Sequence, residues 1–148
     1  MAVVITPQGT LNRLKASCIF PNFSGLNINS GNMGKGFVTV SFDGDFDNLL
    51  HTATGAVTSP EPYVMATVAV DLLRSQPLSG AWIAQAKSIT DLGEMSIFPD
   101  VVTTAFPEID LVNVILKHID PGAFDGTNPV VRATFQGIYY VNTNLWTV

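Results

Sequence analysis

The chain has 148 residues, enough for one ordinary domain, and 47% of them are hydrophobic while only 13% are charged. Typical soluble domains carry about 25% charged residues, so the shortage of charge favours a subunit whose surface is buried in an assembly. The net charge of −5 argues against adhesive nucleic-acid binding, and no apolar run approaches the roughly 18 residues of a membrane span.

The first part of the chain offers two segments that superficially suggest chemistry. Cys18 cannot form an internal disulfide, and it precedes Ile19 and Phe20 in an apolar, strand-like context, so we expect a buried, inert thiol. Residues 30–36 (SGNMGKG) contain Gly and Lys but lack the spacing of a phosphate-binding loop. We interpret them as a flexible turn.

Residues 1–10 lack the pattern of a signal peptide, so secretion by that route is not expected.

Residues 37–42 alternate in polarity and predict a half-buried strand, and three carboxylates follow it at alternate positions. Asp43, Asp45 and Asp47 could fill positions 1, 3 and 5 of a calcium loop. Asn48 and Thr54, however, stand where that loop needs a Gly and a bidentate Glu. We therefore expect a solvated acidic turn and no bound metal.

Residues 43–62 form a long polar stretch without a strong period. Loops of about twenty residues are uncommon in compact domains and usually serve a function. This stretch predicts a protruding loop or hairpin, or an arm that becomes ordered against a partner.

The strongest predicted strand is Tyr63–Leu73, which places Val64, Val68 and three other apolar residues on one face and Asp71 on the other. Residues 74–88 predict the one helix, about ten residues long, with Pro77 in its first turn. Its buried side should carry Leu78, Trp82 and Gln85 or Ala86.

Further strands are predicted over residues 95–98, 101–106, 111–118 and 131–141, with a turn over residues 120–129. In the third of these, Val112, Val114 and Leu116 should share the core face. The whole pattern predicts a single domain (residues 1–148) of mainly β class. We expect an antiparallel β-barrel or sandwich with one short flanking α-helix and a long extended loop or hairpin arm.

No constellation of residues supports catalysis or a cofactor. The only histidines are His51 and His118, no Ser lies in a GxSxG motif, and the paired acids Glu108 and Asp110 are better explained by solvent exposure. The tryptophans and Tyr139 and Tyr140 do not cluster along the chain, which favours packing in a core or interface over a carbohydrate platform.

A family resemblance rests on three segments, FVTVSFDGDF, YVMATVAVDLLRSQPLSGAW and VILKHIDPGAFDGTNPVVRATFQGIYYV. Their order is strand, acidic polar loop, apolar strand, Ser-x-Pro turn and short helix, followed by paired strands. Over roughly residues 36–141 the chain resembles the tail tube proteins of contractile-tailed bacteriophages, especially those of Mu-like and related phages.

The resemblance implies homohexameric rings that stack into a hollow tube inside a contractile sheath, in the tail of a virion assembled in the host cytoplasm. The implied partners are further copies of the chain, the sheath, tape measure, baseplate and tail terminator proteins, and double-stranded DNA that passes through the lumen without specific binding. It also implies an arm at residues 43–62 that contacts neighbouring subunits, and acids that line the lumen. The candidate arm residues are Asp43, Asp45, Phe46, Asp47, Leu49, Leu50, His51 and Glu61, and the candidate lumen acids are Asp43, Asp45, Asp47 and Asp71.

Two alternatives remain at this point. One is the tube subunit of a bacterial contractile injection system, either a secretion system or a bacteriocin, in which the cargo differs. The other is a small β-sandwich binding module of a tail or baseplate, which predicts a saturable response of tryptophan fluorescence to a sugar. A hydrolase is a distant third because no nucleophile and base form a plausible pair.

Overall fold

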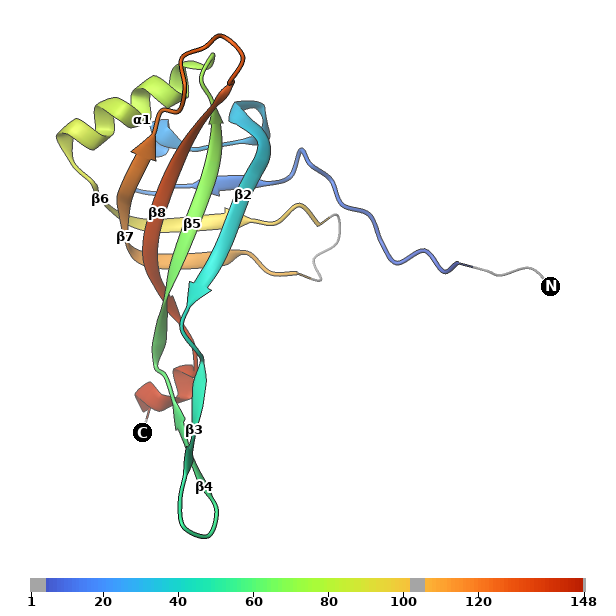
Figure 1. The fold of residues 1–148 in the computed structure, drawn as a ribbon, viewed down its shortest axis with the longest axis vertical. Coiled ribbons are helices and arrows are strands. Elements are labelled where there is room, and N and C mark those ends of the chain that lie inside the picture. The colour runs from blue at the N-terminus through green and yellow to red at the C-terminus, as the bar shows by residue number, and fades with distance from the viewer. Residues whose placement is uncertain (1–4, 102–105, 148) are drawn as a thin grey trace.

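A computed structural model describes residues 5–101 and 106–147 and confirms the mainly β class with one α-helix and a hairpin arm (Figure 1). Six strands form one curled antiparallel sheet, a half-barrel, in the order β1-β6-β7-β8-β5-β2, while β3 and β4 form a separate hairpin. In chain order the elements are β1 (Ser17–Ile19), two 3-10 turns η1 (Ser24–Leu26) and η2 (Ser30–Asn32), β2 (Met33–Asp43), β3 (Asp47–His51), β4 (Ala56–Pro60), β5 (Tyr63–Leu73), α1 (Pro77–Ser88), β6 (Asp91–Phe98), β7 (Ile109–Asp120), β8 (Val130–Tyr140) and the 3-10 turn η3 (Thr143–Thr147).

The centre of the sheet is the pair β5 and β8, and both strands follow the alternation seen in the sequence. Val68 lies opposite Phe135 in this antiparallel register, and both side chains are buried. The alternate residues of β5, such as Thr67 and Tyr63, face away from the core and are more exposed. Burial of one face of each strand explains why period-2 hydrophobicity located these strands correctly.

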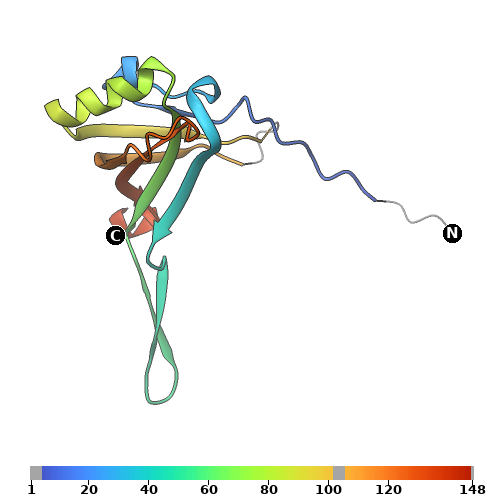
Figure 2. The same ribbon diagram turned by 45° about the horizontal axis from the view of Figure 1, so that its top comes forward.

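Strand β7 departs from simple alternation, and here one expectation is wrong. Asn113 has a φ of 51°, and the pairing of β7 with both neighbours shifts register around it. This β-bulge moves Val112 off the core face, so Leu111 is buried in its place together with Val114 and Leu116. Figures 1 and 2 show the bend, with the first half of β7 lying along β6 and its second half along β8.

Helix α1 begins at Pro77, whose missing N–H costs nothing in the first turn, and it runs for 12 residues. Trp82 is fully buried and contacts Phe20 and Phe135 with ring centroids 4.9 and 5.1 Å away. Leu78 packs at the edge of the same core, as expected. Gln85 is half-buried and Ala86 is exposed, which settles the alternative left open between them.

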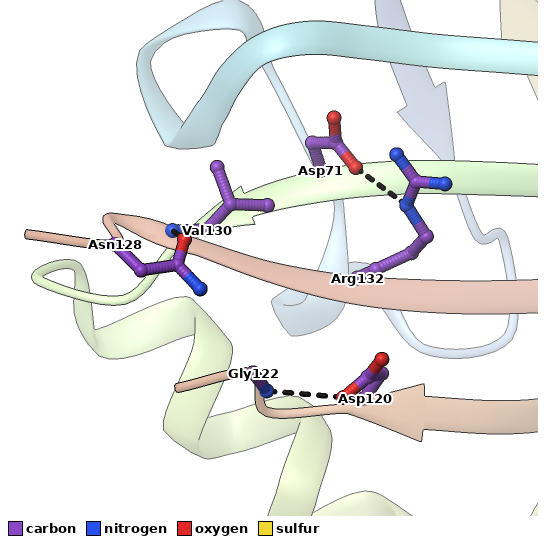
Figure 3. A network of polar contacts seen from close by, with 6 residues as sticks. All are labelled: Asp71, Asp120, Gly122, Asn128, Val130 and Arg132. Atoms are coloured by element: carbon purple, nitrogen blue, oxygen red, sulfur yellow. Dashed lines mark hydrogen bonds and ion pairs between the residues drawn. The ribbon is translucent and has the colours of Figure 1, made fainter. Parts of the chain in front are cut away.

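Residues 30–36 are ordered secondary structure and not a flexible turn, because η2 ends at Asn32 and β2 begins at Met33. In β2, Gly36 lies against the buried carboxylate of Asp71. This carboxylate accepts a 3.0 Å hydrogen bond from Nε of Arg132 (Figure 3). Only a residue without a Cβ fits at position 36, because the Asp71 side chain lies directly against the β2 backbone there.

Gly36→Ala is therefore expected to lower the free energy of unfolding by about 1–3 kcal/mol, because the new Cβ would overlap Oδ2 of Asp71. Urea denaturation followed by circular dichroism measures this change. Gly80→Ala is the matched control: Gly80 is exposed in α1, no atom lies within 4 Å of the Cβ position, and the change should stabilise the helix by up to about 1 kcal/mol. Equal effects of the two substitutions would contradict this explanation.

The remaining expectations concern the end of β6 and membrane insertion. Of the strand expected over residues 101–106, positions 102–105 lie outside the described residues, and Val101 forms a single β-bridge with Leu11. Among the residues that the structure describes, no helix is long and apolar enough to cross a membrane.

Candidate functional site

The most distinctive surface of the protein is the hairpin of β3 and β4, which projects from the half-barrel in both views (Figures 1 and 2). We call residues 43–62 the arm. The arm continues the ribbon of β2 and β5, and its register places Leu49 opposite Thr58 and Leu50 opposite Val57. Thr52 and Gly55 close the hairpin with a 2.9 Å backbone hydrogen bond.

Both faces of the arm carry exposed apolar side chains. Leu49 is 72% exposed on one face, and Leu50 and Val57 are more than half exposed on the other. Isolated two-stranded hairpins are only marginally stable in water, and exposed apolar patches commonly mark interaction sites. The arm therefore presents apolar side chains to solvent on both of its faces.

The base of the arm is held by Asn142, a residue that the sequence did not single out. Its Nδ2 donates hydrogen bonds to the carbonyl oxygens of Phe46 and Glu61, at 2.9 and 2.8 Å. The backbone N–H of Glu61 also bonds the carbonyl oxygen of Phe46 at 2.9 Å. Asn142 has a φ of 49°, a conformation that Asn tolerates better than most residues. The residue type alone was the only hint in the sequence.

A row of aromatic rings supports the same junction. Phe42 at the end of β2 lies 4.8 Å from the ring of Tyr139 and 5.6 Å from that of Phe46. These contacts join the arm to the core-facing side of β2 and β8. Packing and hydrogen bonds therefore fix the direction in which the arm leaves the body.

The acids of the arm do not gather into a metal site. Asp43, Asp45 and Asp47 are exposed, and Oδ2 of Asp43 accepts a 2.7 Å hydrogen bond from the hydroxyl of Thr67. Among the described residues, no group of three or more His, Cys, Asp or Glu is arranged to hold a metal ion. His51 is exposed at the end of β3 and Glu61 is half-buried at the base of the arm.

Asp71 differs from the other three candidate lumen acids. It is buried in β5, and its carboxylate pairs with Arg132 on the adjacent strand β8 (Figure 3). The charge of Asp71 is thereby compensated locally, whereas the acids of the arm face solvent. This placement fits a role in joining β2, β5 and β8 better than a role in repelling a polyanion.

Two further features complete the surface. Strand β2 ends the six-stranded sheet, so its outer edge has no strand beside it in the described part of the chain. Near the C-terminus, Tyr140 and Trp146 form an exposed aromatic pair with ring centroids 6.1 Å apart. Open edges and exposed aromatic rings are both common at protein interfaces.

Cys18 is buried in β1, and burial raises the pKa of its thiol to about 12. Because the thiolate is the reactive form, the native protein is expected to be inert toward a thiol-specific chromogenic reagent at pH 8. One thiol per chain should react after unfolding in guanidinium chloride. Rapid stoichiometric labelling of the native protein would contradict this prediction.

Three features therefore distinguish the described surface: an exposed apolar arm with a fixed base, an open strand edge and an exposed aromatic pair. No protein-family model matches the chain, and a comparison with curated proteins also finds no match.

Proposed function

We propose that this chain is the structural subunit of a bacteriophage tail tube, in which hexameric rings stack into a hollow tube inside a contractile sheath. The observation that carries the proposal is the arm, which presents Leu49, Leu50 and Val57 to solvent from a fixed base. An arm of this kind is suited to reach a neighbouring subunit or ring and to bury its apolar side chains there.

The curled sheet supports the same proposal. An open strand such as β2 invites pairing with another chain, and closing a ring of subunits removes the edges that would otherwise cause open-ended aggregation. Permanent interfaces commonly bury 2,000 Å² or more, which is consistent with a chain of only 13% charged residues.

In this proposal the protein acts without catalysis, within the virion tail and after assembly in the host cytoplasm. The sheath, tape measure, baseplate and terminator proteins contact the tube, and DNA passes through its lumen. The exposed carboxylates of Asp43, Asp45 and Asp47 lie near the lumen or between rings, where they repel DNA or pair with a neighbour's cation. Asp71 serves within the subunit, through Arg132.

Electron microscopy of the purified full chain tests the proposal. We expect negative-stain images at high protein concentration to show rings or tubes with six-fold symmetry, and sedimentation velocity to show concentration-dependent association. A protein that stays monomeric at every concentration, with neither rings nor tubes, would overturn it.

The exposed pair of Tyr140 and Trp146 favours a second candidate, a binding module of a tail or baseplate that stacks sugars on aromatic rings. Trp82 is fully buried, so a fluorescence response to an oligosaccharide would come from Trp146, which is 63% exposed. This candidate predicts a saturable titration that Trp146→Phe abolishes. A flat titration with a broad panel of oligosaccharides would remove it.

A further inference from the structure

The half-barrel does not close on itself, and a cleft of about 510 Å³ opens between the edge strand β2 and the region where β6 ends and β7 begins. One wall is β2 with its open edge, and the other is formed where β6 ends and β7 begins. The lining is mostly apolar, and its main side chains are Val38, Val40, Phe42, Ile97, Phe98 and Ile109. Val38, Val40 and Phe42 are only partly buried by the residues that the structure describes (5–101 and 106–147), so those residues leave part of the apolar lining exposed.

The chain also contains an exposed, uncharged segment with a large apolar side chain at each end. Residues 5–11 (ITPQGTL) carry no charged side chain, and Ile5 and Leu11 at their ends are 87% and 68% exposed. In both views this part of the chain extends away from the body (Figures 1 and 2). Seven extended residues span roughly 23 Å, which is enough to reach a neighbouring molecule.

The place where this segment leaves the body is fixed beside the cleft. The backbone N–H of Asn12 donates a 2.6 Å hydrogen bond to the carbonyl oxygen of Asp100, and Leu11 forms a bridge with Val101. Arg13, next along the chain, and Asp100 both line the cleft. The segment therefore starts at the cleft of its own molecule and points outward from it.

Each copy thus offers one uncovered apolar cleft beside an open strand edge and one exposed, uncharged, extended segment. Extended segments commonly bind proteins by lying along an open strand edge and placing their side chains in adjacent pockets. Because every chain carries both features, a segment can fill the cleft of another copy either reciprocally, in a two-fold dimer, or head to tail along a series of copies. Head-to-tail contacts of this kind produce closed rings or open helical assemblies.

We propose that residues 5–11 of one copy occupy the cleft beside β2 in a second copy. This inference rests on the proposed tube function and deepens it by naming a contact between subunits. Ile5 is the side chain that lies farthest from the point of attachment, and it reaches the apolar lining of the neighbour near Val40. The proposed occupant is a second copy of the chain because every copy contributes one segment and one cleft. Segments and clefts are therefore present in equal number.

Thiol cross-linking between full-length copies tests the contact. A tagged Ile5→Cys chain is mixed with an untagged Val40→Cys chain under assembly conditions and treated with a mild oxidant. We expect a reducible heterodimer, and no background from Cys18, which is fully buried. The matched control pairs Ile5→Cys with Lys87→Cys, an exposed position on α1 that does not line the cleft, and this pair should give little product.

The results separate this inference from the proposed function. Tubes without the Ile5–Val40 cross-link would overturn the inference and leave the tube function standing, whereas the cross-link without tubes would support the inference alone. A double variant Ile5→Cys/Val40→Cys that oxidises to a monomeric loop at high dilution would show that the segment folds into its own cleft, and this would also overturn the inference.

A second measurement needs no cysteine. Ile5→Asp should weaken self-association about tenfold or more in sedimentation experiments. Burying one large aliphatic side chain contributes at least as much binding free energy as a tenfold change in affinity. Ile5→Leu, which keeps the apolar volume, should associate like the original chain. Equal association constants for Ile5→Asp and Ile5→Leu would contradict the proposed contact.

Discussion

Replacing Trp82 with alanine is expected to lower the free energy of unfolding by about 3–5 kcal/mol. Trp82 is the largest fully buried side chain, and its ring lies within 5.1 Å of those of both Phe20 and Phe135. Alanine would leave a cavity between α1 and the sheet. Because small domains are stable by only about 5–15 kcal/mol, this one substitution removes a large part of the total. Urea denaturation followed by far-ultraviolet circular dichroism measures it.

Two further variants identify the cause of that loss. Trp146→Ala removes the same side chain from an exposed site and should change stability by about 0.5 kcal/mol or less. Trp82→Phe keeps an aromatic ring, and Nε1 of Trp82 has no hydrogen-bond partner among the described residues, so this change should cost much less than alanine. If Trp82→Ala and Trp146→Ala had similar effects, the assignment of the core would be wrong.

Leu50→Glu in the arm is expected to abolish rings and tubes while leaving the subunit folded. Leu50 is about half exposed and lies opposite Val57 on one face of the hairpin, so the charge would disrupt the apolar contact that the proposed tube makes there with a neighbouring subunit. The cost to the free energy of unfolding should stay below about 1 kcal/mol, which is the span of strand propensities. Negative-stain microscopy and thermal unfolding measure the two effects separately.

Three comparisons make this arm prediction specific. Leu50→Ile keeps the apolar volume and should still form tubes. Asn48→Asp adds a negative charge on the same face of β3 without removing an apolar group, and it should also permit assembly. Leu49→Glu tests the opposite face. Normal tubes from both Leu49→Glu and Leu50→Glu would show that the arm does not make the proposed contact.

The fold class was predictable because the central strands bury one face completely. In β5 the residues Val64, Ala66, Val68 and Val70 are buried at alternate positions. Burial of one face requires apolar side chains at every second position, and this alternation is visible in the sequence. The same argument located β8, whereas Pro77 and the polar residues before it were the main signal for the helix with Trp82. Where one face of an element is buried and the other is not, periodicity was a reliable guide.

Other features escaped prediction because their causes are not periodic. The bulge at Asn113 inserts one residue and reverses the faces of β7, and no local signal other than the Asn itself marks it. In the arm, the adjacent Leu49 and Leu50 point to opposite faces, so no alternation was visible. The bond from Asn142 to Phe46 and the cleft lined by Val40 depend on segments that lie far apart along the chain.

The topology also bears on how the protein reaches its native state. Strand β1 pairs with β6, as in the contact between Cys18 and Ile97, so the sheet cannot be completed until segments far apart in the chain have met. Proteins dominated by such distant pairings fold in milliseconds to seconds, and they expose unpaired strands in the meantime. Because β2 is still an edge strand after folding, the risk of wrong pairing between chains rises with protein concentration. We expect productive assembly to compete with misassembly, so that slow release of subunits from denaturant gives a higher yield of ordered particles than rapid dilution at high concentration.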